Sequence, residues 1–363
     1  PSGFLAMCTS NMTAPVATVD PAQGGSPQDY FNTVLYTGNG ATTHAISGVG
    51  FQPDWVWGKV RSKVSTHWLF DVVRGATQQM NTDTNHVEST QGTMLKTFDS
   101  DGFSMGNDNP GNENTETFVA WNWKTGTSFS NDASATGVGN LDSAGSLNTD
   151  VGFSIIGWTG NNTDNATIAH GLGVKPAMIM AKSRSVTGSW RVWHQGLSGA
   201  GYYLTLDDNS AEGNSTSVWG GSPSQTSTTF TIGTNSDVNT NSATYIAYCF
   251  AEVDGYSKFG TYIGNENADG TFVYTGFRPA FILIKKIAAG DWGIYDNKRE
   301  GFNEENAVLY PAENIAEGNE ASRKIDLLSN GFKLRTSNVT FNDDSTTVYM
   351  AFAEQPFKYS NAR

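Results

Sequence analysis

The chain has 363 residues, of which 40 are glycines; aromatic residues make up 12% of the sequence and charged residues 16%. Few charges disfavour long solvent-exposed helices, and many turn formers and aromatic residues are typical of short strands, so we predict an all-β protein. A net charge of −13 opposes binding to nucleic acid or to anionic lipid, and no segment approaches the ~18 apolar residues of a transmembrane helix.

Taken in chain order, residues 1–30 contain Pro15, Pro21 and a Gly24-Gly25 pair, which indicates a connector. An internal repeat begins after it. The tetrapeptide Tyr36-Thr-Gly-Asn39 recurs as Trp158-Thr-Gly-Asn161 and as Tyr262-Ile-Gly-Asn265. Such self-similarity at a fixed period indicates a repeated structural unit.

Further positions follow the same period. Each copy has a proline with a glycine three residues before it and a lysine six residues after it, and a tryptophan follows the proline at 15, 14 and 13 residues. These positions are Pro53, Pro176 and Pro279; Gly50, Gly173 and Gly276; Lys59, Lys182 and Lys285; and Trp68, Trp190 and Trp292. Retention across copies favours a structural role for them. We expect the lysines to carry a strand to the surface with their heads in water; the alternative is a repeated contact to an acidic glycan or partner.

Each copy also closes with a similar strand: 117–123, 244–250 and 348–352. Val119, Trp121 and Trp123 alternate with smaller residues, which indicates one bulky face, and Ala120, Ala247 and Ala351 are matched as small positions. Strand–turn–strand signals precede the closing strand at 98–103 and 328–332. About 100 residues with many short strands predict a β-sandwich, of jelly-roll or lectin-like type.

The predicted organisation is therefore three tandem β-sandwich units. Unit 1 covers residues 31–126, unit 2 covers 151–256 and unit 3 covers 257–363. Residues 127–150 are rich in Gly, Ser, Thr, Asn and Asp, and we interpret them as a flexible polar linker. The segment 312–328 is the single helical candidate.

Motifs for catalysis and metal binding are absent from the sequence. It contains no G-x-S-x-G, P-loop, H-E-x-x-H or EF-hand pattern, and its five histidines and two cysteines (Cys8 and Cys249) lack the spacing of a zinc site. We therefore expect no enzymatic activity, no cofactor and no metal, and we read the cysteines as unpaired thiols.

Aromatic residues that break the repeat are the better functional candidates. Sugar rings stack on Tyr and Trp faces, and Asn or Asp side chains supply directional hydrogen bonds. Such candidates for glycan binding are Tyr202, Tyr203, Asp207 and Trp219. The alternative is that these aromatic residues belong to the core or to subunit contacts.

Several stretches resemble a repeated domain of unknown function that is widespread in tail and tail-fibre proteins of bacteriophages. They include residues 152–160, 168–176, 244–250, 272–279 and 349–363, and the resemblance covers residues 31–363. Residues 1–10 resemble the last strand of a lectin-like β-sandwich that precedes these repeats in longer relatives. Unit 1 departs most from the pattern, and the family supplies no catalytic residues.

The resemblance implies a structural protein of the phage virion, in a tail fibre or another host-facing appendage, that binds a host-surface glycan or assembles with other virion proteins. The alternatives are a decoration protein on the capsid surface and a tailspike depolymerase that cleaves host polysaccharide. Ten tryptophans and twenty phenylalanines exceed what three small cores easily bury, so we also expect a homo-oligomer, a trimer as in many phage fibres.

Overall fold

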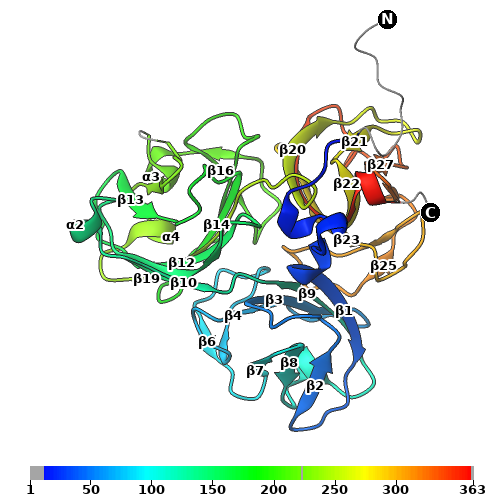
Figure 1. Cartoon of the computed structure of the whole chain (residues 1–363), viewed down its shortest axis with the longest axis horizontal. Coiled ribbons are helices and arrows are strands. Elements are labelled where there is room, and N and C mark those ends of the chain that lie inside the picture. Colours follow the sequence, from blue (N-terminus) through cyan, green and yellow to red (C-terminus); the bar gives the residue numbers. More distant parts are fainter. Residues whose placement is uncertain (1–11, 222–223, 361–363) are drawn as a thin grey trace, which may run out of the picture.

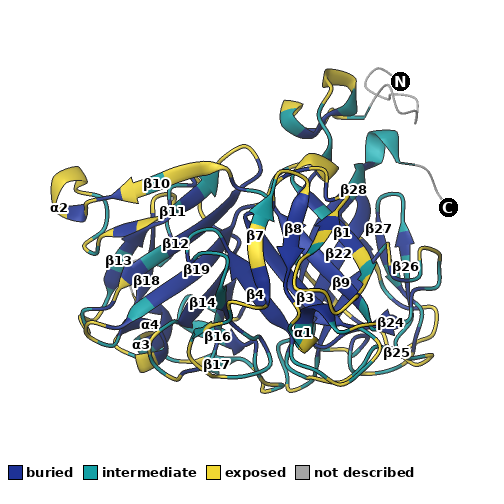
Figure 2. Ribbon diagram, turned by 90° about the horizontal axis from the view of Figure 1, so that it is seen from below, coloured by how far each residue is buried: buried dark blue, intermediate teal, exposed yellow. Residues whose placement is uncertain are grey.

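The computed structural model describes residues 12–221 and 224–360, and it confirms an all-β chain with short helices. Three lobes surround a common centre in Figure 1. Figure 2 shows buried residues along the strands β3 (Trp55–Val60), β4 (Trp68–Asp71) and β9 (Thr117–Trp123) and exposed residues along β10 (Thr127–Asn131). The connector forms three 3-10 turns, η2 (Ala17–Val19), η3 (Pro21–Gln23) and η4 (Pro27–Asp29). The strand proposed for residues 1–10 lies outside the described residues.

Unit 1 contains two main antiparallel sheets with the hydrophobic cluster of Val56, Trp68 and Phe103 between them. The inner sheet has the order β1-β9-β3-β4, and the outer sheet has the order β2-β8-β7. The elements are β1 (Phe31–Thr37), β2 (His44–Ser47), β3 (Trp55–Val60), β4 (Trp68–Asp71), β5 (Gln78–Gln79), β6 (Ser89–Thr90), β7 (Leu95–Asp99), β8 (Gly102–Met105), α1 (Asn109–Asn112) and β9 (Thr117–Trp123).

Unit 2 repeats this strand order as β12-β19-β14-β15, with β13-β18 as the second sheet, and its inner sheet is extended at both edges. Residues 127–150 form part of that extension, so the flexible-linker interpretation is wrong. The elements are β10 (Thr127–Asn131), α2 (Ala133–Thr136), β11 (Ser143–Asn148), β12 (Phe153–Thr159), β13 (Ala166–Ala169), β14 (Met178–Ser183), β15 (Arg191–His194), β16 (Tyr202–Thr205), β17 (Gly213–Asn214), α3 (Thr216–Trp219), β18 (Thr229–Ile232), α4 (Ser236–Asn239) and β19 (Thr244–Phe250).

Unit 3 has the inner order β20-β28-β22-β23 and the outer order β21-β27-β26. The helix expected over 312–328 does not form; β25 and β26 lie there instead. The elements are β20 (Ser257–Ile263), β21 (Phe272–Tyr274), β22 (Phe277–Lys286), β23 (Trp292–Asp296), β24 (Ala307–Val308), β25 (Gly318–Asn319), β26 (Ile325–Leu328), β27 (Gly331–Leu334), β28 (Thr346–Pro356) and η5 (Phe357–Tyr359).

The three inner sheets turn their bulky faces toward one another and share a single aromatic core. Trp55 of unit 1 stacks on Tyr248 of unit 2 with ring centroids 4.5 Å apart, and Trp123 meets Phe352 of unit 3 at 5.7 Å. Phe250 and Phe352 join units 2 and 3 at 5.9 Å. All ten tryptophans are buried within this one chain. The aromatic surplus in the sequence therefore has an intramolecular explanation, and it no longer supports a subunit interface.

The tetrapeptide repeat is explained by a buried asparagine that recurs in every unit. Asn112, Asn239 and Asn342 are fully buried. Their side-chain oxygens accept hydrogen bonds of 3.0, 2.9 and 3.0 Å from the backbone N–H of the motif asparagines Asn39, Asn161 and Asn265.

The aromatic residue and the glycine of each tetrapeptide contact the loop that carries the buried asparagine. The aromatic residue of each motif donates to the carbonyl just before the buried asparagine, at 2.7 Å from Tyr36, 3.2 Å from Trp158 and 2.7 Å from Tyr262. A Cβ on the motif glycine would approach that loop's backbone to within 2.0 Å at Gly38 and 2.3 Å at Gly160. The tetrapeptide is thus a docking motif for its own unit.

The structure shows that two sets of residues matched by spacing in the sequence are not structurally equivalent in all three units. Trp68 points into the outer cluster of unit 1, whereas Trp190 and Trp292 point into the shared core. By strand register, His67 occupies the place of those two tryptophans in unit 1. A shift of one residue moves a strand side chain to the opposite face, so spacing alone misplaced Trp68.

The alanines matched between the closing strands are not all equivalent either. Lys59, Lys182 and Lys285 lie opposite Val119, Ile246 and Val348, so the residue matching Ala120 and Ala247 is Tyr349 and not Ala351. Because the error is two residues, it preserves the inward and outward alternation, and the sequence pattern does not reveal it. Gly50, Gly173 and Gly276, in contrast, are correctly matched: all three have positive φ angles, of 90°, 73° and 84°.

Each unit also reaches over the next in a closed ring. The N–H of Gly188 in unit 2 donates to Asn85 of unit 1, at 3.0 Å. The equivalent bonds run from Gly290 to Asn209 at 2.8 Å and from Ser65 to Asn314 at 2.8 Å. The last of these returns from unit 3 to unit 1. Because the first and last units are joined without chain continuity, the molecule is one closed body.

Candidate functional site

The residues predicted to bind glycan do not form one surface. Tyr202 and Tyr203 are neighbours on β16, so they face opposite sides of the sheet: Tyr202 packs on the shared core and Tyr203 on the core of unit 2. The guanidinium of Arg191 lies 4.6 Å from the ring centroid of Tyr203. Trp219 is fully buried, so the expectation of an exposed ring there is wrong. No motif in the sequence marks which core each of these aromatic side chains meets.

Asp207 has a structural role at the same end of unit 2. Its carboxylate accepts a hydrogen bond of 2.8 Å from the backbone N–H of Trp190. Burial raises the pKa of this carboxyl, although that bond opposes the shift. Asp207 therefore anchors the segment after β16 to the start of β15.

The three repeated lysines are fully buried, so the expectation that their heads reach water is wrong. Their ammonium groups donate to backbone carbonyls: Lys59 to Val60 at 2.8 Å, Lys182 to His86 at 2.8 Å and Lys285 to Ala288 at 3.0 Å. Burial lowers the pKa of each lysine to about 8. Lys182 thereby ties unit 2 to the segment of unit 1 that reaches over it.

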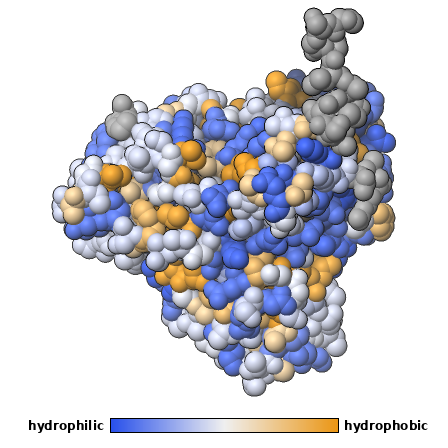
Figure 3. Space-filling model, viewed as in Figure 1, coloured by the Kyte–Doolittle hydropathy of each residue, from blue (hydrophilic) through white to orange (hydrophobic). Residues whose placement is uncertain are grey.

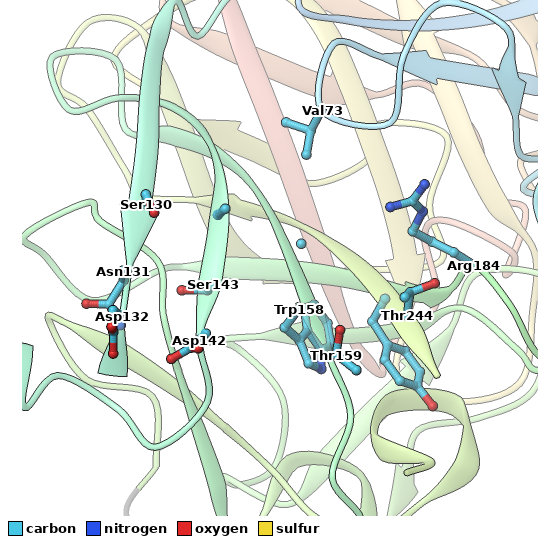
Figure 4. A pocket seen from close by; sticks show the side chains of 13 residues that line it. Val73, Ser130, Asn131, Asp132, Asp142, Ser143, Trp158, Thr159, Arg184 and Thr244 are labelled. Atoms are coloured by element: carbon cyan, nitrogen blue, oxygen red, sulfur yellow. The ribbon is translucent and has the colours of Figure 1, made fainter. Parts of the chain in front are cut away.

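An open groove lies between units 1 and 2, and we call it the junction groove. It consists of two adjoining cavities of about 420 and 480 Å³ that share Val73 and Ala144. Figure 4 shows the first of them, with side chains from β10, β11 and β12 on one side and Val73 and Arg184 on the other. Its lining residues are Val73, Ser130, Asn131, Asp132, Asp142, Ser143, Ala144, Gly157, Trp158, Thr159, Arg184, Thr244 and Tyr245.

The floor of the groove consists of small residues on two neighbouring strands of one sheet. Ala144 of β11 lies directly opposite Gly157 of β12, and neither side chain fills the space in front of the sheet. Both β10 and β11 come from the segment 127–150, for which the other two units have no counterpart. The groove is therefore specific to the junction of units 1 and 2.

Polar groups surround this small-residue floor. Asp132 is the N-cap residue of α2. Its carboxylate accepts hydrogen bonds from Ser134, and these bonds lower the pKa of the carboxyl. Asp142 accepts a bond of 2.9 Å from the N–H of Ala133. On the opposite wall, Arg184 is paired with Glu88 of unit 1 at 2.9 Å. With two carboxylates on one wall and its one arginine already paired, the groove suits a neutral polar ligand better than an anionic one.

The adjoining cavity continues along unit 1. Asp54 is buried there and accepts a bond of 2.7 Å from the N–H of Thr125, while burial raises its pKa. The hydroxyl of Thr125 lies 2.7 Å from that of Ser146 on β11. This network fixes the β10–β11 hairpin against unit 1, so the groove has a preformed wall.

Within residues 12–221 and 224–360, no cluster of three His, Cys, Asp or Glu side chains could hold a metal ion. In the same part of the chain no helix is both long and apolar enough to cross a bilayer. The surface in Figure 3 is a mixture of hydrophilic and hydrophobic residues.

Sequence reasoning missed the residues that close the ring of units. They belong to a short repeat, Asn85-His-Val-Glu88, Asn209-Ser-Ala-Glu212 and Asn314-Ile-Ala-Glu317. The N–H of each glutamate donates to the hairpin of the next unit, at 3.0 Å to Arg184, 2.7 Å to Ile287 and 2.8 Å to Arg61. The three copies share the pattern Asn-x-(Val/Ala)-Glu, but only two of its four residues are identical in all three, which is too few to identify a repeat.

These features define an all-β protein whose antiparallel sheets enclose one shared aromatic core and leave an open polar groove at one junction. The chain belongs to the family described as "Domain of unknown function (DUF7483)", which matches residues 26–356 and so spans all three units in a single match. No curated protein and no solved structure matches the chain.

Proposed function

We propose that the protein is a structural component of a bacteriophage virion, in a tail fibre or another host-facing appendage, and that it works by binding a host-surface glycan. The resemblance of residues 152–160, 168–176 and 349–363 to phage tail proteins supports the first part. The repeated pairs of sheets further support our interpretation of each unit as a β-sandwich of jelly-roll or lectin-like type.

The observation that carries the binding function is the junction groove. It is open, it is lined by hydroxyl, amide and carboxylate groups, and its hairpin is held in place by the Asp54–Thr125–Ser146 network. A preformed groove with a few convergent polar groups is the usual form of a small-ligand site. Rigid walls also reduce the entropy lost when a flexible sugar chain binds.

The location is tested by immunogold labelling of phage particles with antibodies against this chain. We expect label on tails or fibres. Label confined to heads would replace this proposal with a capsid-decoration role.

The binding function is tested by incubating the full chain with host polysaccharide and following both retention and released oligosaccharide. We expect retention without turnover, and sustained release would indicate a depolymerase. The variant Ala144→Trp fills the groove from an exposed position, and we expect it to lose retention. Ala45→Trp is the matched control, since Ala45 is an exposed alanine on β2 of unit 1, away from the groove. Equal retention by both variants would overturn the groove assignment.

A further inference from the structure

The outer edge strand of unit 3 carries two exposed aromatic side chains that the other units lack. Phe272 is 44% exposed and Tyr274 is 56% exposed, on either side of the buried Val273. Val273 pairs with Phe332 as Ile46 pairs with Phe103 and Ile168 with Phe230. The positions of the two aromatic residues are thereby filled by Ala45 and Ser47 in unit 1 and by Thr167 and Ala169 in unit 2.

The fold does not require aromatic residues at these positions, since two of three units form the same strand pair with small ones. An exposed tyrosine and phenylalanine also keep apolar surface in water, which is unfavourable unless something covers it. The two rings therefore point to a ligand and not to a scaffold role.

Tyr274 is also part of the wall of a separate cavity of about 330 Å³. Its lining also includes Asp254, Lys358, Met12 and Thr13. Gly276 makes a turn with φ of 84° beside the ring, and a side chain there would lie 3.7 Å from the Tyr274 hydroxyl. The turn thus leaves the hydroxyl end of Tyr274 open to the cavity.

The two charged residues of this lining form no close ion pair. Among the described residues, neither Asp254 nor Lys358 has an oppositely charged side chain within 4 Å; Asp20 interacts electrostatically with Lys358 from farther away, and the ammonium of Lys358 lies 5.9 Å from the centroid of the Tyr359 ring. A carboxylate and an ammonium beside an aromatic face offer both acceptors and donors next to a stacking surface. This combination suits a sugar ring, whose C–H face stacks and whose hydroxyls both donate and accept.

We propose that Tyr274, Asp254 and Lys358 form a second carbohydrate-binding site, on unit 3, and that Phe272 extends it along β21 to a further sugar ring. Side chains two residues apart on a strand face lie about 7 Å from each other, so one extended glycan spans both rings. The ligand class rests on the proposed function, but the site is separate from the junction groove and needs none of its residues.

The experiment is binding of the full chain to a printed array of bacterial capsular and O-antigen polysaccharides. We expect Tyr274→Ala to weaken binding to a retained glycan at least tenfold and Phe272→Ala to weaken it less. Tyr274→Trp keeps a stacking face and should retain binding. The matched control is Phe302→Ala, because Phe302 is an exposed aromatic residue elsewhere on unit 3. Thermal melting shows whether each variant is folded; Tyr274 is exposed, so we expect all of them to melt with the wild type.

The outcomes separate this inference from the proposed function. Unchanged array binding of folded Tyr274→Ala overturns the site on unit 3, even if Ala144→Trp abolishes binding and the groove stands. Loss with Tyr274→Ala but not with Ala144→Trp supports the site on unit 3 alone. No binding to any printed glycan overturns both sites, whereas head labelling of particles affects only the virion location.

Discussion

The hydroxyl of Tyr248 in unit 2 donates a hydrogen bond of 2.7 Å to the carboxylate of Asp71 in unit 1. The same relationship joins unit 3 to unit 1, where Trp121 donates to Asp296 at 2.9 Å. Each carboxylate is also paired with an arginine three residues on, Arg74 or Arg299. In unit 2 the equivalent residue is His194, whose Nε2 lies 3.1 Å from the carbonyl of Tyr349 in unit 3. The ring is therefore closed by buried polar contacts as well as by the aromatic core.

The Tyr248–Asp71 contact predicts a loss of stability in Tyr248→Phe. Removing the donor leaves a buried charged acceptor with one partner fewer, and hydrogen bonds to charged groups contribute about 1.5–3 kcal/mol. We expect chemical denaturation to show a lower free energy of unfolding by about that amount. Tyr202→Phe is the control, because the hydroxyl of Tyr202 makes no hydrogen bond in the described residues and should change stability little. Equal effects in the two variants would contradict the role of this bond.

Replacing one of the buried asparagines is expected to lower the free energy of unfolding as well. Asn342 accepts from Asn265 and donates to the carbonyls of Asn267 and Thr336 at 2.9 and 2.6 Å, so Asn342→Ala leaves the buried carbonyl of Thr336 and two partly buried backbone groups without these partners. Each such group costs about 1–3 kcal/mol. We expect a free energy of unfolding at least 2 kcal/mol lower, about the cost of one or two of these groups. The exposed Asn241→Ala is the control and should melt with the wild type.

The repeated lysines predict a contribution to stability that rises with pH above 8. Their pKa values are about 8 in the folded chain against an ordinary 10.5, because burial disfavours the charged form. Between these values the unfolded chain binds more protons than the folded one, so raising the pH favours folding. We expect Lys285→Met to reduce the slope of unfolding free energy against pH from 8 to 10.5. An unchanged slope in this variant would show that the ammonium stays charged in the fold.

The raised pKa of Glu305 predicts a contribution to stability that falls, and does not rise, with increasing pH. Burial, with the nearby carboxyls of Glu300 and Asp296, raises its pKa from 4.5 to about 8. Between these values the folded chain binds more protons than the unfolded one, so this group's contribution falls as the pH rises from 4.5 to 8. Glu305→Gln removes the ionisation, and we expect the variant to gain stability relative to the wild type on going from pH 5 to pH 8. Denaturant titrations at those two pH values measure the difference.

Much of the local structure follows from sequence patterns. The alternation of Val119, Trp121 and Trp123 correctly predicts one face toward a core, and the signals at 98–103 and 328–332 are confirmed as the β7–β8 and β26–β27 hairpins. The glycines before each proline are retained because the turn needs positive φ, which only glycine adopts without strain. These features depend on residues close in the chain, so local chemistry determines them.

The candidate sites could not be predicted in the same way. Tyr202 and Tyr203 looked alike in the sequence but face different cores, and the junction groove is formed by Val73 and Ala144, which are 71 residues apart and carry no motif. The exposed pair Phe272 and Tyr274 becomes visible only when strand register identifies its small counterparts in the other units.

By itself, the sequence determined the all-β class, the period of the repeat and the positions that each unit needs for its own turns and strands. The tertiary structure alone decided that the lysines are buried, that Trp68 and Trp190 face different cores and that unit 3 returns to unit 1. The physical reason is that side-chain alternation is the same for an inner and an outer face, and for neighbouring registers two residues apart. Which of them is realised depends on packing between segments that are distant in the chain.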